Sequence, residues 1–160
     1  MRMSGIGADP TPLTATLRAV ARWIALVLVV ALVAGCGGSS RKTSEKEIRR
    51  SVLGFLHSLA DGNANKACSL LTARGRKQLF TADTKADCVK TVRKVTSRGG
   101  AAANRTRREL RGAHIAVVTF KSDTRAEAAA QLPTENAPTA PFNVVKRGDR
   151  WLIDGTRPGG

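Results

Sequence analysis

Hydrophobic and polar residues are spaced in three different ways along this chain. Residues 23–34 are an unbroken run of 12 uncharged, apolar side chains. From residue 44 to about residue 100 the apolar residues recur at helical spacing. Beyond residue 100 the spacing changes to the alternation that is typical of strands. The pattern predicts a short hydrophobic segment followed by one α+β domain.

The first predicted helix begins at Ser44 and ends at Asp61-Gly62-Asn63. Ser44 and Glu47 match a capping box, in which the serine hydroxyl and the glutamate side chain each satisfy a backbone N–H of the first turn. One apolar stripe follows at helical spacing: Ile48, Val52, Phe55, Leu56 and Leu59. This stripe is expected to pack on the core.

Three shorter helices are predicted after the first. They cover residues 64–71, a segment capped by Thr72 that reaches about residue 80, and a segment that begins near Thr84. Asp87 stands at the capping-box position of the last one, and Gly99-Gly100 ends it. Its expected core side chains are Val89, Val92 and Val95.

The pattern then changes. Residues 101–108 are polar and are predicted to be irregular, whereas residues 114–121 are rich in β-branched side chains and predict a strand. A turn follows at residues 122–124. Residues 125–132 fit either a helix, because of their alanines, or a strand face, because those alanines alternate with polar residues.

The last part of the domain is predicted to be a hairpin. Residues 133–141 read as a loop, and residues 142–146 and 151–154 flank a turn at Gly148 and Asp149. Helices first and an antiparallel meander afterwards predict helices packed on one face of a sheet.

The apolar run near the N-terminus is typical of an export signal. Arg18 and Arg22 precede it, and its length falls short of the ~18 residues that a membrane-spanning helix needs. The alternative is a short transmembrane anchor, but glycines at positions 35, 37 and 38 interrupt the helix where such a span would have to continue.

Residues 32–36, Leu-Val-Ala-Gly-Cys, resemble the lipobox of bacterial lipoproteins. The resemblance implies cleavage before Cys36 and a diacylglyceryl group on its thiol. It divides the chain into a signal peptide (1–35), a lipidated cysteine with a flexible tether (36–43), a domain (44–156) and a tail (157–160). The expected location is the extracytoplasmic face of the cell membrane.

Cys68 and Cys88 are the two remaining cysteines. In an oxidising compartment an even pair predicts a disulfide, and closing a loop of about 20 residues would stabilise the fold by roughly 3 kcal/mol. Two buried free thiols are the alternative. Neither cysteine has another Cys or a His nearby in sequence, so no metal site is expected, and no motif points to a cofactor.

The chain carries a net charge of +15, which falls to +13 once residues 1–35, with three arginines and one aspartate, are removed. Such a charge favours anionic partners such as lipid headgroups or wall polymers. Export and the scarcity of aromatic residues argue against nucleic acid. The alternative is that an arginine-rich composition reflects a GC-rich genome.

Eight cations are concentrated in residues 90–111, against Glu109 alone. They form a candidate anion-binding patch: Lys90, Arg93, Lys94, Arg98, Arg105, Arg107, Arg108 and Arg111. Three of them share one helix face by their i, i+3, i+4 spacing. The alternative is a solvated helix face followed by a loop.

Four segments of the domain resemble the nuclear-transport-factor-2-like superfamily, and small actinobacterial lipoproteins of that fold in particular. They are residues 55–62 (Phe-Leu-His-Ser-Leu-Ala-Asp-Gly), residues 67–72 (Ala-Cys-Ser-Leu-Leu-Thr), Cys88, and residues 151–154 (Trp-Leu-Ile-Asp). The resemblance covers residues 44–156. It implies a cone-shaped domain whose curved antiparallel sheet wraps the first helix and can enclose a pocket.

Enzymes of this superfamily place acidic, histidine or tyrosine side chains inside the cone, whereas the first helix here offers only apolar ones. His57 lies about half a turn from the apolar stripe and His114 has no carboxylate nearby in sequence. Trp151 is expected in the core and Asp154 away from it. No catalytic residue is therefore assigned.

We expect a non-enzymatic, membrane-anchored binding or interaction domain of the cell envelope. One alternative is a small-molecule hydrolase or isomerase that uses the cone pocket, which would need a titratable group pointing inward. The other is a structural accessory that presents an apolar surface to an envelope protein partner.

Overall fold

The computed structural model describes residues 37–134 and 139–157. The expected signal peptide, Cys36 and the last three residues of the expected tail lie outside the described residues. The chain divides into two compact units, residues 1–41 and 42–160. Among the described residues, all of the buried core side chains and the disulfide belong to the second unit, so it is expected to fold without the first 36 residues.

Five helices are described in the first half of the chain: α2 (Gly37–Ala60), α3 (Ala64–Ser69), α4 (Ala73–Phe80), α5 (Lys85–Thr96) and α6 (Ala101–Arg111). The predicted caps of α4 and α5 are confirmed. The Thr72 hydroxyl accepts from the Gly75 N–H, and the Thr84 hydroxyl accepts from the Asp87 N–H.

Helix α2 begins earlier than expected. It runs from Gly37, so the predicted flexible tether over residues 37–43 and the predicted N-cap at Ser44 are wrong. The prediction relied on the low helix propensity of Gly-Gly-Ser-Ser. Once the apolar stripe has fixed the later turns, extending the helix adds one hydrogen bond per residue at little cost. The Glu45–Arg49 ion pair, with a separation of 2.8 Å, strengthens the turn that follows Ser44.

Helix α6 occupies the segment that was predicted to be irregular. Its residues are mostly alanine, arginine and leucine, which are good helix formers. Arg105 pairs with Glu109 one turn later at 2.9 Å. Ala103, Arg107 and Leu110 are half-buried at i, i+4 and i+7. The prediction failed because this inward face contains only two apolar side chains.

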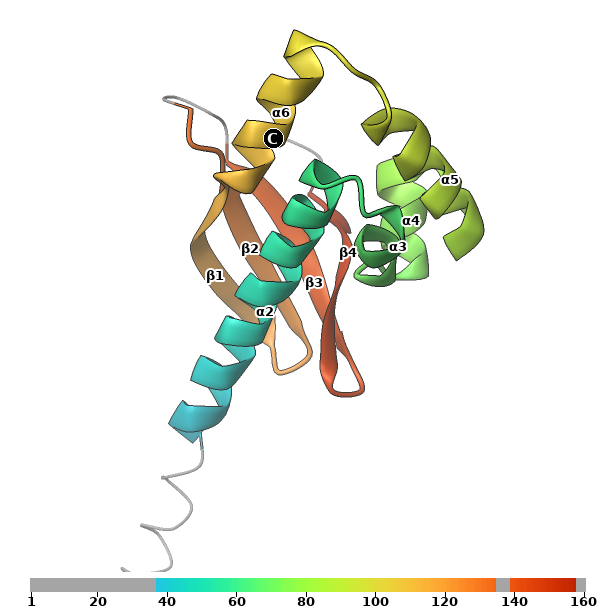
Figure 1. Cartoon of the computed structure of the whole chain (residues 1–160). Helices are drawn as coiled ribbons and strands as arrows, with labels where there is room; N and C mark the ends of the chain where they lie inside the picture. The colour runs from blue at the N-terminus through green and yellow to red at the C-terminus, as the bar shows by residue number, and fades with distance from the viewer. Residues whose placement is uncertain (1–36, 135–138, 158–160) are drawn as a thin grey trace, which may run out of the picture. The chain divides into compact units, whose positions relative to one another are not determined.

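The second half is a four-stranded antiparallel sheet in the order β1-β2-β3-β4. Its strands are β1 (His114–Ser122), β2 (Arg125–Gln131), β3 (Ala140–Arg147) and β4 (Arg150–Thr156). The segment that fitted a helix or a strand is strand β2, and Ala126, Ala128 and Ala130 are its buried face. The predicted α+β order is thus confirmed, and α2 lies across one face of the sheet (Figure 1).

The core lies between α2 and the sheet. Ile48, Val52 and Phe55 of α2 are buried there together with Phe142 and Trp151 of the sheet. Phe55 meets Phe142 edge to face, with ring centroids 6.2 Å apart. Apolar side chains therefore fill the space that a cone pocket would occupy.

Two polar side chains also fix α2 to the sheet. The Ser51 hydroxyl donates to the Trp151 carbonyl over 2.8 Å, and Arg49 Nη1 donates to the Ile115 carbonyl over 2.6 Å. These bonds join α2 to β4 and β1, the two outer strands of the sheet.

The connection between α3 and α4 covers the outer edge of β4. The Thr72 N–H donates to the Ile153 carbonyl, and the Ile153 N–H donates to the Leu70 carbonyl, both over 2.9 Å. Leu71 thereby forms a parallel bridge with Ile153. The predicted helix extended to residue 71, whereas α3 ends at Ser69. The pairing with β4 explains the difference, because it uses the backbone of Leu70 and Thr72.

Candidate functional site

The disulfide between Cys68 and Cys88 is confirmed. It joins α3 to α5 with the Cα atoms 6.1 Å apart, and both side chains are fully buried. The alternative of two free thiols is excluded in this structure. The bridge fixes the first turn of α5 and so helps to position the helix that carries three of the eight predicted cations.

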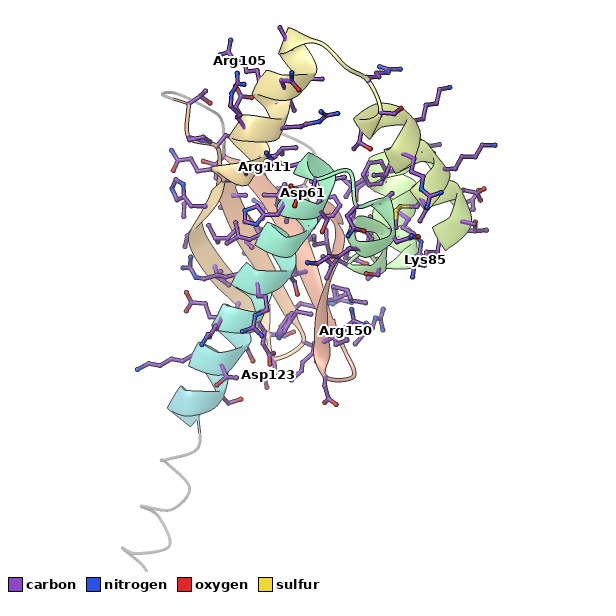
Figure 2. The ribbon with its side chains drawn as sticks, in the orientation of Figure 1. Asp61, Lys85, Arg105, Arg111, Asp123 and Arg150 are labelled. Atoms are coloured by element: carbon purple, nitrogen blue, oxygen red, sulfur yellow. A yellow bond between two sulfur atoms is a disulfide. The ribbon has the colours of Figure 1, made fainter. Side chains whose placement is uncertain are left out.

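The eight predicted cations are distributed over two helices. Lys90, Arg93 and Lys94 belong to α5 and Arg98 follows it, while the other four belong to α6. All of these side chains are exposed except Arg107, which is half-buried. Figure 2 labels Arg105 near the middle of α6 and Arg111 at its last residue. The structure gives these cations different roles.

Arg107 holds α6 against the end of α5. Its Nη2 donates to the Thr96 carbonyl over 2.5 Å and to the Arg98 carbonyl over 3.3 Å. Carbonyls at the end of a helix lack partners within the helix and attract a cation. The sequence does not predict this contact, because Arg107 lies on a helix that its pattern does not reveal.

Arg111 holds the other end of α6. Its Nε and Nη2 donate to the same Asp61 oxygen over 3.0 and 2.9 Å. Asp61 follows the last residue of α2, and both side chains are labelled in Figure 2. Together with Arg107, this contact attaches α6 at two points.

Five of the eight cations remain open to an external anion. Over residues 37–134 and 139–157, no acidic side chain forms an ion pair with Lys90, Arg93, Lys94, Arg98 or Arg108. Arg105 is paired with Glu109, so it adds less net charge to the surface. The predicted patch is therefore smaller than its sequence suggests and is centred on α5.

A groove of about 250 Å³ lies between α5 and α6. Its apolar wall is formed by Leu59, Phe80, Val92, Val95, Ala103 and Leu110. Thr96, Thr106, Arg98 and Arg107 complete the lining. The groove is not predictable from the sequence pattern, because one of its walls is α6, a helix that the pattern does not reveal.

Val95 corrects an expectation about α5. It was expected in the core with Val89 and Val92, but only Val92 is fully buried, and Val95 is 53% exposed. Val95 lies one helical turn after Val92 on the same face of α5. At that point the face no longer contacts the core and instead lines the groove. Val95 is thus an exposed apolar side chain in the wall of the groove.

The predicted non-catalytic residues lie as expected. His57 and His114 are exposed, and Trp151 is buried at 1% exposure. Asp154 points away from the core, where it accepts from the Thr72 hydroxyl over 2.6 Å. In the described part of the chain, no three His, Cys, Asp or Glu side chains gather into a metal-binding group.

No helix within the described ranges combines the length and the apolar character needed to cross a membrane. Searches of protein-family models and of curated proteins find no match to this chain. The lipobox at Cys36 and the likeness to the nuclear-transport-factor-2-like superfamily stay predictions.

Proposed function

We propose that this protein is a lipoprotein, anchored by Cys36 to the extracytoplasmic face of the cell membrane, whose folded domain binds a partner without catalysis. One observation supports it most directly. The chain has three cysteines, and the disulfide uses Cys68 and Cys88, so Cys36 is the single thiol left over. That thiol stands at the end of the lipobox-like segment.

The disulfide also supports the location. Disulfides persist in oxidising compartments outside the cytoplasm and are rare within it. A buried bridge between two helices is therefore in keeping with an exported domain.

The packing favours binding over catalysis. Phe55, Phe142 and Trp151 fill the space between α2 and the sheet, which is where an enzyme of the nuclear-transport-factor-2-like type would hold its acidic and basic groups. We also propose that the domain has the nuclear-transport-factor-2-like fold, and its α+β arrangement supports this. The exposed cations of α5 suit an anionic partner, either a lipid headgroup or a wall polymer.

Metabolic labelling with tritiated palmitate tests the anchor. The full chain is expected to incorporate label and to lose residues 1–35, as intact mass of the membrane fraction will report. Two acyl chains anchor a protein stably, whereas one gives only marginal binding. Cys36→Ala is expected to abolish labelling and to leave the precursor uncleaved.

The paired variant Cys68→Ala/Cys88→Ala is the control, because it removes two other cysteines and is expected to label normally. Wild-type protein that stays unlabelled and soluble with residues 1–35 attached would refute the proposal.

A further inference from the structure

We propose that the groove between α5 and α6 binds the hydrocarbon chain of a fatty acid, whose carboxylate is held at the groove by Arg98. This inference deepens the proposed function, since it names a ligand for the exported domain. It rests on the shape, the lining and the charge of the groove.

The wall of the groove is apolar and open. Val95 is one of two large hydrophobic side chains that are more than half exposed among the described residues. Leu59, Phe80 and Leu110, on three different helices, border the same space. A hydrocarbon chain would remove these surfaces from water, which is the main favourable term in apolar binding.

The polar part of the groove selects an anion. Its lining contains two arginines and no acidic residue. Arg107 already donates to the carbonyls of Thr96 and Arg98. The guanidinium of Arg98 is exposed and forms no ion pair with a described residue, so its planar fork is available to a carboxylate.

The dimensions favour a single-chain ligand. At about 250 Å³ the groove falls just below the ~300–1,000 Å³ of pockets that enclose drug-sized molecules. One stretch of a fatty acid fits such a volume, whereas the two chains of a phospholipid do not. One free guanidinium also matches the single charge of a carboxylate.

The walls are attached to the body of the domain. Arg107 holds α6 to the end of α5, and Arg111 holds it to Asp61 after α2. A site whose walls are fixed beforehand loses less entropy when it binds.

Calorimetric titration with dodecanoate, below its micelle concentration, tests the proposal. The protein is the chain from Gly37 onward, exported behind a cleavable signal so that the disulfide forms. We expect one dodecanoate per chain, no binding of acetate, and binding of dodecanol at least about tenfold weaker, because a hydrogen bond to a charged group contributes about 1.5–3 kcal/mol.

Two variants probe the two halves of the site. Val95→Gln places an amide in the apolar wall, and Arg98→Gln removes the cation. Each is expected to weaken dodecanoate binding about tenfold or more. Both positions are exposed, so the melting temperature is expected to stay near that of the wild type.

Two matched controls carry the same substitutions outside the groove. Val117→Gln changes a side chain of β1 that is 52% exposed, against 53% for Val95. Lys94→Gln removes an exposed cation of α5 that does not line the groove. Both controls are expected to bind dodecanoate like the wild type.

Several results would overturn the proposal: no binding of dodecanoate, unchanged binding by Val95→Gln, or dodecanol binding as tightly as dodecanoate. Tighter binding of a dodecanoyl lysophospholipid would assign the site to a phosphate headgroup instead. The titrated protein lacks Cys36, so failure here leaves the anchor proposal to the palmitate experiment, and failure of labelling leaves the groove standing.

Discussion

Gly75 is the residue on which the packing of α4 against β4 depends. A Cβ atom at this position would lie 2.5 Å from the Ile153 carbonyl oxygen, a separation at which one of the two groups has to move. That oxygen already accepts a hydrogen bond from the Thr72 N–H. The backbone around it therefore has little freedom to give way.

Gly75→Ala is expected to lower the free energy of unfolding by about 1–3 kcal/mol, the usual cost of forcing extra atoms into a packed site. The clash outweighs the gain of up to ~1 kcal/mol that alanine brings to a helix. Urea unfolding followed by far-ultraviolet circular dichroism measures the change.

Gly99→Ala is the control for this variant, because an added Cβ there meets nothing within 4 Å. It is expected to leave the urea midpoint nearly unchanged. Equal midpoints for Gly75→Ala and the wild type would show that α4 can move away from β4 without cost.

At the scale of the elements, the helices and strands that could be predicted from the sequence are those with a capping residue or a turn residue at their ends. Thr72 and Thr84 cap helices as expected, and Gly148 forms the β3–β4 turn with a φ of 58°. Each signal involves residues close in sequence, so it can be read without the fold. The disulfide was predictable for a different reason, since only two cysteines remained to pair.

The elements that were missed depend on distant contacts. Helix α6 owes its place to Arg107 and Arg111, whose partners lie on other elements. The helical spacing of Ala103, Arg107 and Leu110 could have predicted α6. It was not recognised as an inward face, because its central residue is a charged arginine. The groove could not be predicted, because one of its walls is α6.

Arg107→Gln is expected to loosen α6. It removes bonds from a charged donor to the Thr96 and Arg98 carbonyls, and such bonds contribute about 1.5–3 kcal/mol where they are shielded from water. Because Arg107 is only half-buried, we expect an effect at the lower end. Amide hydrogen exchange within α6 should then accelerate about tenfold.

Arg108→Gln is the matched control, since Arg108 is the exposed neighbour and forms no ion pair with a described acidic side chain. It is expected to leave exchange in α6 unchanged. The same acceleration in both variants would mean that loss of charge, rather than loss of these two bonds, loosens the helix.

At the scale of the whole molecule, excess positive charge dominates the surface. The chain beyond residue 35 keeps a net charge of +13, and the open cations of α5 lie close together. Arg105 and Arg107 are unsuitable for testing this charge, because they bind Glu109 and the end of α5. Lys90, Arg93 and Lys94 are suitable, because their side chains are exposed and form no ion pair with a described acidic residue.

Reversal of Lys90, Arg93 and Lys94 to Glu is expected to abolish binding of the chain from Gly37 onward to phosphatidylglycerol vesicles. Wild-type binding should weaken as salt is added, because exposed charges are screened beyond about 8 Å at physiological ionic strength. Vesicle co-sedimentation over a range of salt concentrations measures both effects.

The control reverses Arg125, Arg147 and Arg150, which changes the net charge by the same amount on the sheet; Arg150 is labelled in Figure 2. It is expected to retain most of the binding. If both triple reversals weaken binding equally, overall charge rather than the α5 surface attracts the vesicles.

The pairing of the α3–α4 connection with β4 bears on the order in which the chain can complete its fold. Thr72 and Asp154 are hydrogen-bonded although 82 residues separate them. A polypeptide is made from its N-terminus, so the connection exists well before β4 does. Cys68 and Cys88 also precede β4 in the chain, so both ends of the bridge are present before the strand that completes the sheet.

Until β4 is in place, the Leu70 carbonyl and the Thr72 N–H lack their partners on Ile153, and the core lacks the side chains of Trp151 and Ile153. A chain that ends before β4 would therefore expose a strand edge, which is a template for pairing with another chain. By covering that edge, β4 protects the helical half of the domain from aggregation.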